Sequence, residues 1–154
     1  MNVGVRRARV ADARAAAEVL IRSRRAAFPA VPAGVHTDDE VREWFATVVV
    51  PGREVWVAEA DDADGGEPVA VLVLQDGWVD QLYVLAEWTG RGVGSRLVAL
   101  AKARHDALDL WAFQSNVDAI RFYEGHGFVE VERTDGSDNE EGEPDVHLRW
   151  ERRQ

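Results

Sequence analysis

A glycine-rich turn that joins an expected strand to an expected helix contains the first residues that could bind a ligand. Gly90, Gly92 and Gly94 alternate with other residues, and Arg91 adds a positive charge within the same turn. Glycine lets the backbone approach a ligand closely, and the first amides of a helix are unpaired hydrogen-bond donors at its positive end. The turn therefore predicts an anion site that suits a pyrophosphate group.

Two widespread nucleotide-binding loops do not fit this turn. A Walker A loop ends in Lys followed by Ser or Thr, and the chain contains neither pair. The dinucleotide fingerprint Gly-x-Gly-x-x-Gly begins at Gly90 and Gly92 but has Ser95 at its last position. A different anion-binding turn is therefore favoured, and a tight strand-to-helix turn that binds nothing is the alternative.

A second segment, from Asn116 to Phe128, also combines residues that could do chemistry. Asn116 can cap a helix through its side-chain oxygen. Tyr123 follows seven residues later, which is close to two helical turns, so both side chains lie on one helix face. We expect Tyr123 to present its hydroxyl to any pocket that this face borders.

Together the two segments resemble the GNAT superfamily of N-acetyltransferases, which transfer an acyl group from acetyl-CoA to an amine. The family's phosphate-loop pattern, Gln/Arg-x-x-Gly-x-Gly/Ala, is matched by Thr89, Gly92 and Gly94, with Thr89 in place of the usual first residue. Asn116, Phe122-Tyr123 and Gly127-Phe128 are similar to the family's other CoA-side motif. The resemblance covers residues 81–128 directly, and the order of the expected elements fits it along the whole chain.

The resemblance implies a role for each matched residue. The backbone of Leu82, Tyr83 and Val84 would pair with the pantetheine amides of acetyl-CoA and hold the thioester carbonyl. Asn116 would contact the pantetheine arm, and Tyr123 would lie near the sulfur. The pyrophosphate would be bound by the turn that consists of Thr89, Gly90, Arg91, Gly92, Val93, Gly94 and Ser95.

Acyl transfer to an amine requires two proton transfers, one from the acceptor ammonium and one to the leaving thiolate. A phenol with a reference pKa of roughly 10 can protonate the thiolate, so Tyr123 is the expected general acid. Packing against the last strands is the alternative role for Tyr123. Asp80, two residues before Leu82, is the expected base, directly or through water. His36 is a second candidate for the base, and Asp80 could instead be a plain exposed carboxylate.

The acceptor site is expected near the loop between the last two strands. Six of the twelve residues from Thr134 to Asp145 are acidic, and such carboxylates would attract a cationic amine, although a solvated loop is the plainer interpretation. We expect substrate contacts from Asn139, Glu140 and Asp145 in this loop and from Phe28 and His36 near the N-terminal helices. The spacing of the four histidines does not support a metal site.

The elements that position these residues follow from hydrophobic periodicity. Strands are expected at 3–7, 55–59, 68–75, 78–85, 108–113, 128–133 and 146–150, with Asp76-Gly77 as a two-residue hairpin turn. Helices are expected at 13–24 after an Asp12 N-cap, at 37–50 after a Thr37 capping box, at 92–105 and at 116–125. The order predicts an α/β (α+β) fold of the GNAT type in one domain, residues 1–154. Its sheet is mixed and mostly antiparallel, with about six to seven strands and about four helices on both faces.

Composition limits the function classes. The chain has 154 residues and no cysteine, which excludes a disulfide scaffold, a cysteine-ligated metal and a thiol nucleophile. Its net charge of −10 disfavours nucleic acid and anionic membranes as partners. No apolar run approaches the roughly 18–20 residues that span a bilayer, and a cytoplasmic protein is expected.

The sequence thus predicts a metal-free N-acetyltransferase that uses acetyl-CoA and a small-molecule or peptide amine, as a monomer or a homodimer. Two alternatives remain open. The chain could bind acyl-CoA as a sensory or structural domain without turnover, or it could acetylate the N-terminus or a lysine of another protein.

Overall fold

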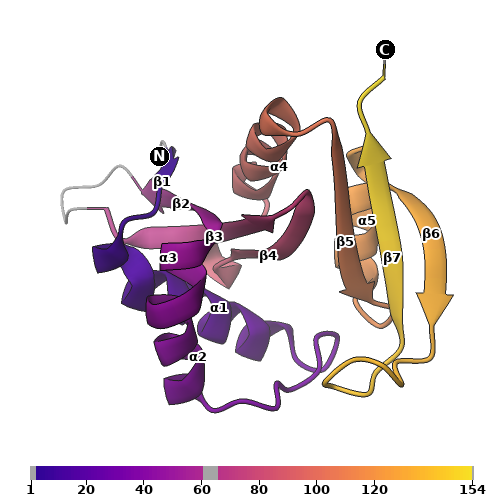
Figure 1. The fold of residues 1–154 in the computed structure, drawn as a ribbon, viewed down its shortest axis with the longest axis horizontal. Helices are drawn as coiled ribbons and strands as arrows, with labels where there is room; N and C mark the ends of the chain where they lie inside the picture. The colour runs from indigo at the N-terminus through magenta and orange to yellow at the C-terminus, as the bar shows by residue number, and fades with distance from the viewer. Residues whose placement is uncertain (1–2, 61–65, 154) are drawn as a thin grey trace.

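The computed structural model describes residues 3–60 and 66–153, which form a seven-stranded sheet with helices around it (Figure 1). The strands pair in the order β1-β2-β3-β4-β5-β7-β6, and only β4 and β5 are parallel. The predicted class and mixed sheet are confirmed. The acidic, glycine-containing segment 61–67 predicts a solvated hairpin tip, and residues 61–65 of it lie outside the described residues. The strand bounds are Val3–Arg7 (β1), Glu54–Ala60 (β2), Pro68–Gln75 (β3), Trp78–Val84 (β4), Ala107–Phe113 (β5), Val129–Thr134 (β6) and Asp145–Glu151 (β7).

The helices occupy the predicted segments. They are α1 (Ala13–Ala27), α2 (Asp38–Trp44), α3 (Val50–Gly52), α4 (Val93–Arg104) and α5 (Val117–Gly125). A π-type turn, Phe45–Val49, joins α2 to α3, so the segment predicted as one helix is a single helical stretch. Figure 1 shows α1 and α2 on one side of β2–β4, α4 on the other, and α5 behind β5 and β7. In the described part of the chain, no helix combines the length and the apolar character needed to cross a membrane.

The sheet consists of two antiparallel halves that meet at one end. Asp76 and Gly77 both have positive φ, of 52° and 82°, and turn β3 into β4 as the hairpin signal predicted. Between the halves, Trp78 of β4 is opposite Asp109 of β5, and no later residue of the two strands pairs in the described part of the chain. Figure 1 shows β4 and β5 separating after this point. Within residues 3–60 and 66–153, the second half of β4 therefore has an edge that no strand covers.

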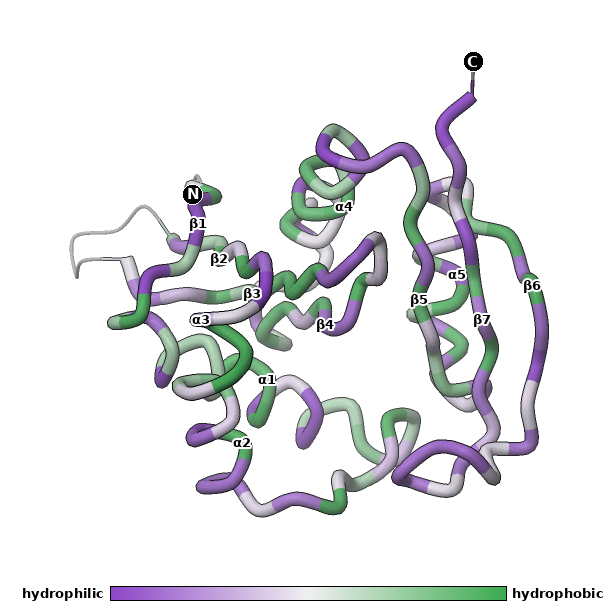
Figure 2. The backbone as a smooth tube through the Cα atoms, in the orientation of Figure 1, coloured by the Kyte–Doolittle hydropathy of each residue, from purple (hydrophilic) through white to green (hydrophobic). Residues whose placement is uncertain are grey.

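The core lies mainly around β3. Its residues Val69–Leu74 are all at most 6% exposed, which is what a central strand covered on both faces requires. Phe45 and Val49 from the π-type turn and Ala16 and Ala17 from α1 are fully buried against this strand's cluster. Figure 2 shows the contrast between the apolar β3 and the polar loop between β6 and β7.

Two helix starts were predicted with different success. The capping box of α2 is present, since the Glu40 amide donates to Thr37 Oγ1 at 3.1 Å and the Glu40 carboxylate accepts from the Thr37 amide at 2.8 Å. The predicted N-cap bond of Asp12 is wrong. A single helical turn, Val10–Asp12, precedes α1, so Asp12 is already helical and its carboxylate instead accepts from Arg6 Nη1 at 2.7 Å.

Candidate active site

The turn before α4 has the geometry of an anion cradle. Gly90 and Gly92 have φ of 74° and 81°, a conformation that side chains rarely adopt, and a Cβ at either residue would meet nothing within 4 Å. Gly92 is the N-cap of α4 and offers no side chain to the helix, so the amides of Val93, Gly94 and Ser95 have no partner within the helix. The space above the glycines and the donors below them fit a pyrophosphate.

Two side chains of the turn add to this cradle. The Arg91 guanidinium lies 4.7 Å from the centre of the Trp88 ring, and across residues 3–60 and 66–153 it forms no ion pair. It is therefore exposed and available to a phosphate. Thr89, which replaces the usual first residue of the pattern, bonds its hydroxyl to Ala86 O at 2.8 Å and so stabilises the turn itself.

The far side of the turn is fixed by α5. A Cβ on Gly94 would lie 3.2 Å from Phe122 Cζ, so glycine allows α4 and α5 to approach closely here. Ser95 Oγ lies 3.1 Å from His126 Nε2 at the end of α5. Burial lowers the pKa of His126, and the nearby Lys102 charge lowers it further. The predicted phosphate turn and the second motif are thus in direct contact.

The uncovered edge of β4 lies where the pantetheine arm was predicted. Leu85 donates its amide to Val69 O at 2.9 Å, and antiparallel pairing alternates along a strand. The backbone groups of Leu82 and Val84 therefore point away from β3, toward the opening beside β5. Ser23 Oγ of α1 already donates to Val84 O at 3.1 Å, which holds α1 at the same edge.

Asn116 and Tyr123 lie on α5 as the spacing predicted. The Ala119 amide donates to Asn116 Oδ1 at 3.3 Å, which confirms the predicted helix cap. The Tyr123 ring is 9% exposed and contacts Phe122 and Phe128. Burial raises the pKa of the Tyr123 phenol, and the neighbouring Tyr83 raises it further. At neutral pH the phenol therefore keeps its proton and can donate it.

Asp80 is the extra residue of a bulge in β4. Val79 pairs with Leu74 and Gln81 pairs with Val73, which leaves Asp80 without a partner on β3. Its carboxylate accepts from Arg53 Nη1 at 3.1 Å. Burial raises the pKa of Asp80, and the Arg53 charge opposes that shift. Bulges of this kind re-aim a side chain next to many active sites.

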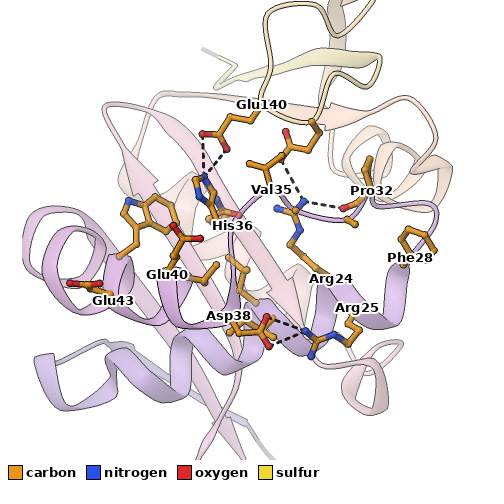
Figure 3. A pocket seen from close by; sticks show the side chains of 18 of the residues that line it. Arg24, Arg25, Phe28, Pro32, Val35, His36, Asp38, Glu40, Glu43 and Glu140 are labelled. Atoms are coloured by element: carbon orange, nitrogen blue, oxygen red, sulfur yellow. Dashed lines mark hydrogen bonds and ion pairs between the residues drawn. The ribbon is translucent and has the colours of Figure 1, made fainter.

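A cavity of about 930 Å³ lies beside β4, between α1, α2 and the loops that follow α1 and β6 (Figure 3). Phe28, His36 and Glu140, three of the five predicted substrate residues, line it. Gln81 brings the lining to β4, immediately before Leu82. Asp80 is not part of the lining, so its predicted contact with an acceptor in this cavity would run through water.

The other two predicted substrate residues stabilise the loop between β6 and β7. Asn139 donates from Nδ2 to Glu143 O at 2.7 Å and to Asp145 Oδ2 at 3.1 Å, and Asp145 also accepts from Thr134. Both residues border a second, smaller hollow of about 510 Å³ beside Trp111. Their polar atoms are engaged within the loop, and the structure does not bring them to the larger cavity.

Sequence reasoning missed two groups near the site. Arg24, in the last turn of α1, lines the larger cavity and lies 3.6 Å from Glu141. In the sequence, a favourable interaction with the helix dipole is a sufficient explanation for an arginine at this position. His147 of β7 is stacked on Trp78 and bonds through Nε2 to Asp109 Oδ1 at 2.7 Å. Only the strand register brings these residues together, and no local pattern reveals it. The described residues contain no group of three acidic or histidine side chains that could hold a metal ion.

Comparisons with known proteins agree with this geometry. A family model described as an acetyltransferase (GNAT) domain matches residues 51–130. The peptidyl-lysine N-acetyltransferase YjaB of Salmonella typhimurium is 29% identical over 89 residues, which are 58% of this chain and 59% of the relative. The matched part thus spans less than two thirds of that relative's length.

Solved structures share the fold over nearly the whole chain. Apo YjaB from Escherichia coli superposes with a TM-score of 0.77 at 23% identity, covering 97% of this chain and 98% of that one. The structure of yncA, a putative acetyltransferase from Salmonella typhimurium with its cofactor acetyl-CoA, gives a TM-score of 0.69 at 18% identity. The match covers 100% of this chain and 96% of that one. At these identities the likeness concerns the fold.

Proposed function

Because this chain belongs to the GNAT acetyltransferase family, we propose that it moves an acetyl group from acetyl-CoA to a primary amine of a small molecule or peptide by direct attack. One observation carries the proposal. The cavity that reaches Gln81, the uncovered edge of β4 at Leu82 and Val84, and the glycine cradle before α4 follow one another along the chain from Gln81 to Ser95. An acceptor, an extended arm and a phosphate group can therefore bind in that order.

Different groups of the chain bind different parts of acetyl-CoA in this proposal. The amides of Val93, Gly94 and Ser95, with Arg91, hold the pyrophosphate. The backbone of Leu82 and Val84 orients the pantetheine arm along the β4 edge. When bound, acetyl-CoA supplies a thioester whose carbonyl carbon accepts the amine nitrogen and whose sulfur leaves.

Two side chains handle the protons in this proposal. Asp80 accepts a proton from the acceptor ammonium through water, which frees the nitrogen lone pair to form the C–N bond. Tyr123 donates its phenol proton to the sulfur as the C–S bond breaks. The nitrogen, positively charged after the C–N bond forms, releases its second proton to solvent, and solvent returns a proton to Tyr123. His36 lines the cavity and lies 3.3 Å from Glu140, so it is the second candidate for the base.

A second candidate function is acetylation of a lysine or N-terminus of another protein. The identity of 29% to a peptidyl-lysine N-acetyltransferase favours it. The chemistry at Tyr123 and Asp80 is the same in both cases, and only the acceptor differs.

Thiol release tests the function directly. The chain is mixed with acetyl-CoA and a panel of primary amines that includes alkylamines, polyamines, amino acids and a lysine peptide. We expect thiol release that depends on one class of amine and matches the acetylated product in amount. Thiol release at the same rate without any amine would contradict amine transfer.

A further inference from the structure

Two loops meet at the rim of the larger cavity, which stays open to solvent at Phe28 and Val35. We call residues 28–37, after α1, the strap, and residues 135–144 the β6–β7 loop. His36 Nε2 of the strap lies 3.3 Å from Glu140 of the β6–β7 loop, a contact that Figure 3 shows directly. Arg24 beneath the strap lies 3.6 Å from Glu141, and it donates to Pro32 O at 3.1 Å.

The strap is also held at its other end. Ser115 Oγ, in the turn between β5 and α5, donates to Ala30 O at 2.7 Å. The strap therefore contacts the β6–β7 loop and the β5–α5 turn at the same time. A polypeptide that ran between these loops would have to break the contacts, whereas a small molecule can occupy the cavity beneath them.

The cavity wall is unusually apolar for a surface that solvent reaches. Phe28, Val35 and Val48 line it with 61%, 57% and 44% of their surface exposed, and they are three of the eight large apolar residues exposed in the described chain. The Trp44 ring belongs to the same wall. Exposed apolar side chains that gather in one hollow mark a binding surface for an apolar group.

The polar part of the lining is acidic. Five carboxylates and two arginines line the cavity. Arg25 binds Asp38 at 2.9 Å and Arg24 pairs with Glu141, as described above. Glu40, Glu43 and Glu140 then have no arginine partner among the residues that the structure describes. The cavity therefore favours a cation that carries an apolar body.

From the contacts that hold the strap, the apolar wall and the excess of carboxylates, we propose that the acceptor is a free small amine with an aromatic or branched apolar body. This inference rests on the proposed function and specifies its acceptor. The cavity volume of about 930 Å³ lies within the range of roughly 300–1,000 Å³ that small-molecule sites occupy. A lysine within a folded protein would have to displace the contacts of the strap, and a polyamine gains nothing from the apolar wall.

The test compares three acceptors at saturating acetyl-CoA: 2-phenylethylamine, spermidine and an unstructured lysine peptide. We expect kcat/KM for 2-phenylethylamine to exceed the other two by at least about tenfold, since apolar contacts in a pocket discriminate by roughly 10- to 200-fold. A peptide or spermidine that is acetylated best would overturn the acceptor inference and leave the acetyltransferase intact. Thiol release with no amine at all would overturn both proposals.

Variants of the wall make the test specific. Phe28→Ser and Val48→Ser should each lower kcat/KM for 2-phenylethylamine about tenfold and leave the affinity for acetyl-CoA unchanged. Val10→Ser is the matched control, because Val10 is 70% exposed and lies outside the cavity. Equal effects of all three variants on 2-phenylethylamine would show that the wall does not bind the acceptor.

Discussion

At the scale of single residues, Tyr123 owes its proposed role to its surroundings. Burial among Phe122 and Phe128 keeps the phenol protonated, and no side chain in the described residues takes its hydroxyl hydrogen. The raised pKa preserves the phenol proton over the whole pH range in which an amine can attack, and it makes the phenol a weaker acid than a free tyrosine. The proton is therefore present for the leaving thiolate, and the phenolate is not available to deprotonate the acceptor.

Tyr123→Phe tests this role with little change in packing. We expect kcat to fall about 100-fold or more, the usual contribution of a general acid, while the dissociation constant of acetyl-CoA stays within about twofold. Single-turnover kinetics and calorimetry give the two numbers. Parallel losses of rate and affinity, or a lowered melting temperature, would assign Tyr123 to packing instead.

Asp80→Asn tests the proposed base through the pH dependence of kcat. Because burial raises the Asp80 pKa, the carboxyl becomes a base only as pH rises through that raised value, so the wild-type rate should fall on the acid side. The variant should be slow near neutrality and lack this acid limb. Arg53→Gln is the control, since it removes the partner 3.1 Å away and keeps the carboxylate. If kcat of Asp80→Asn still fell on the acid side as in the wild type, another group would be the base, and His36 would be the next residue to test.

The surroundings of a single residue could be predicted from the sequence only where its partners lie close to it along the chain. Asn116 and Tyr123 share a helix, so their spacing alone placed them on one face. Asn139 and Asp145 were predicted to bind substrate, but their amide and carboxylate bond within the β6–β7 loop. The conformation of the loop decides which of its polar groups bond to one another, and the sequence contains no periodic signal for that conformation.

At the scale of elements, the start of α4 is the part of the site that depends most on backbone geometry. Arg91→Ala should weaken acetyl-CoA binding about tenfold, because a charge-assisted contact to a phosphate contributes roughly 1.5–3 kcal/mol. The loss should shrink as salt is added. Arg14→Ala, which removes an equal charge from the exposed face of α1, should leave the affinity unchanged in calorimetry. Equal affinities of the two variants would place the pyrophosphate elsewhere.

The link between β1 and α1 gives a separate prediction about stability. Hydrogen bonding to Arg6 lowers the Asp12 pKa from 3.8 to about 2. Asp12 therefore stabilises the folded state above the unfolded value, and this stabilisation disappears as pH falls from about 4 to 2. Allowing for solvent screening, we expect Asp12→Asn to cost roughly 1–2 kcal/mol at pH 6 and much less at pH 2. Urea unfolding at both pH values gives the difference, and an equal cost at both would contradict the ion pair.

Elements were predictable where the signal is local. The positive φ values at Asp76-Gly77 and the capping box at Thr37 follow from the residues themselves. Asp12 does occupy the predicted N-cap position of α1, but its side chain makes no capping bond, because a helical turn that has no clear sequence signal precedes it. The separation of β4 and β5 has no local signal, since strand periodicity contains no information about which strands diverge.

At the scale of the whole molecule, the fold brings three separately predicted features to one opening. The hairpin β3–β4 and the apolar core around β3 fix one side, and β5, β7 and α5 fix the other. Among the residues that the structure describes, β4 and β5 pair only at Trp78 and Asp109, so the part of β4 between the cavity and the cradle has an edge free of strand pairing. The acceptor cavity itself could not be predicted in detail, because its strap and the β6–β7 loop meet through contacts far apart in sequence.

Calorimetric titration of the purified chain with acetyl-CoA, followed by addition of 2-phenylethylamine under thiol detection, tests the central claim most directly. We predict binding at about one site per chain and thiol release only after the amine is added. We also predict loss of that binding in Gly92→Glu, beyond the small fall in melting temperature that a side chain at this positive φ causes. Binding without thiol release for any amine would leave a domain that uses acyl-CoA as a sensory or structural ligand and would contradict the transferase. No binding of acetyl-CoA or CoA would contradict the whole account of the site.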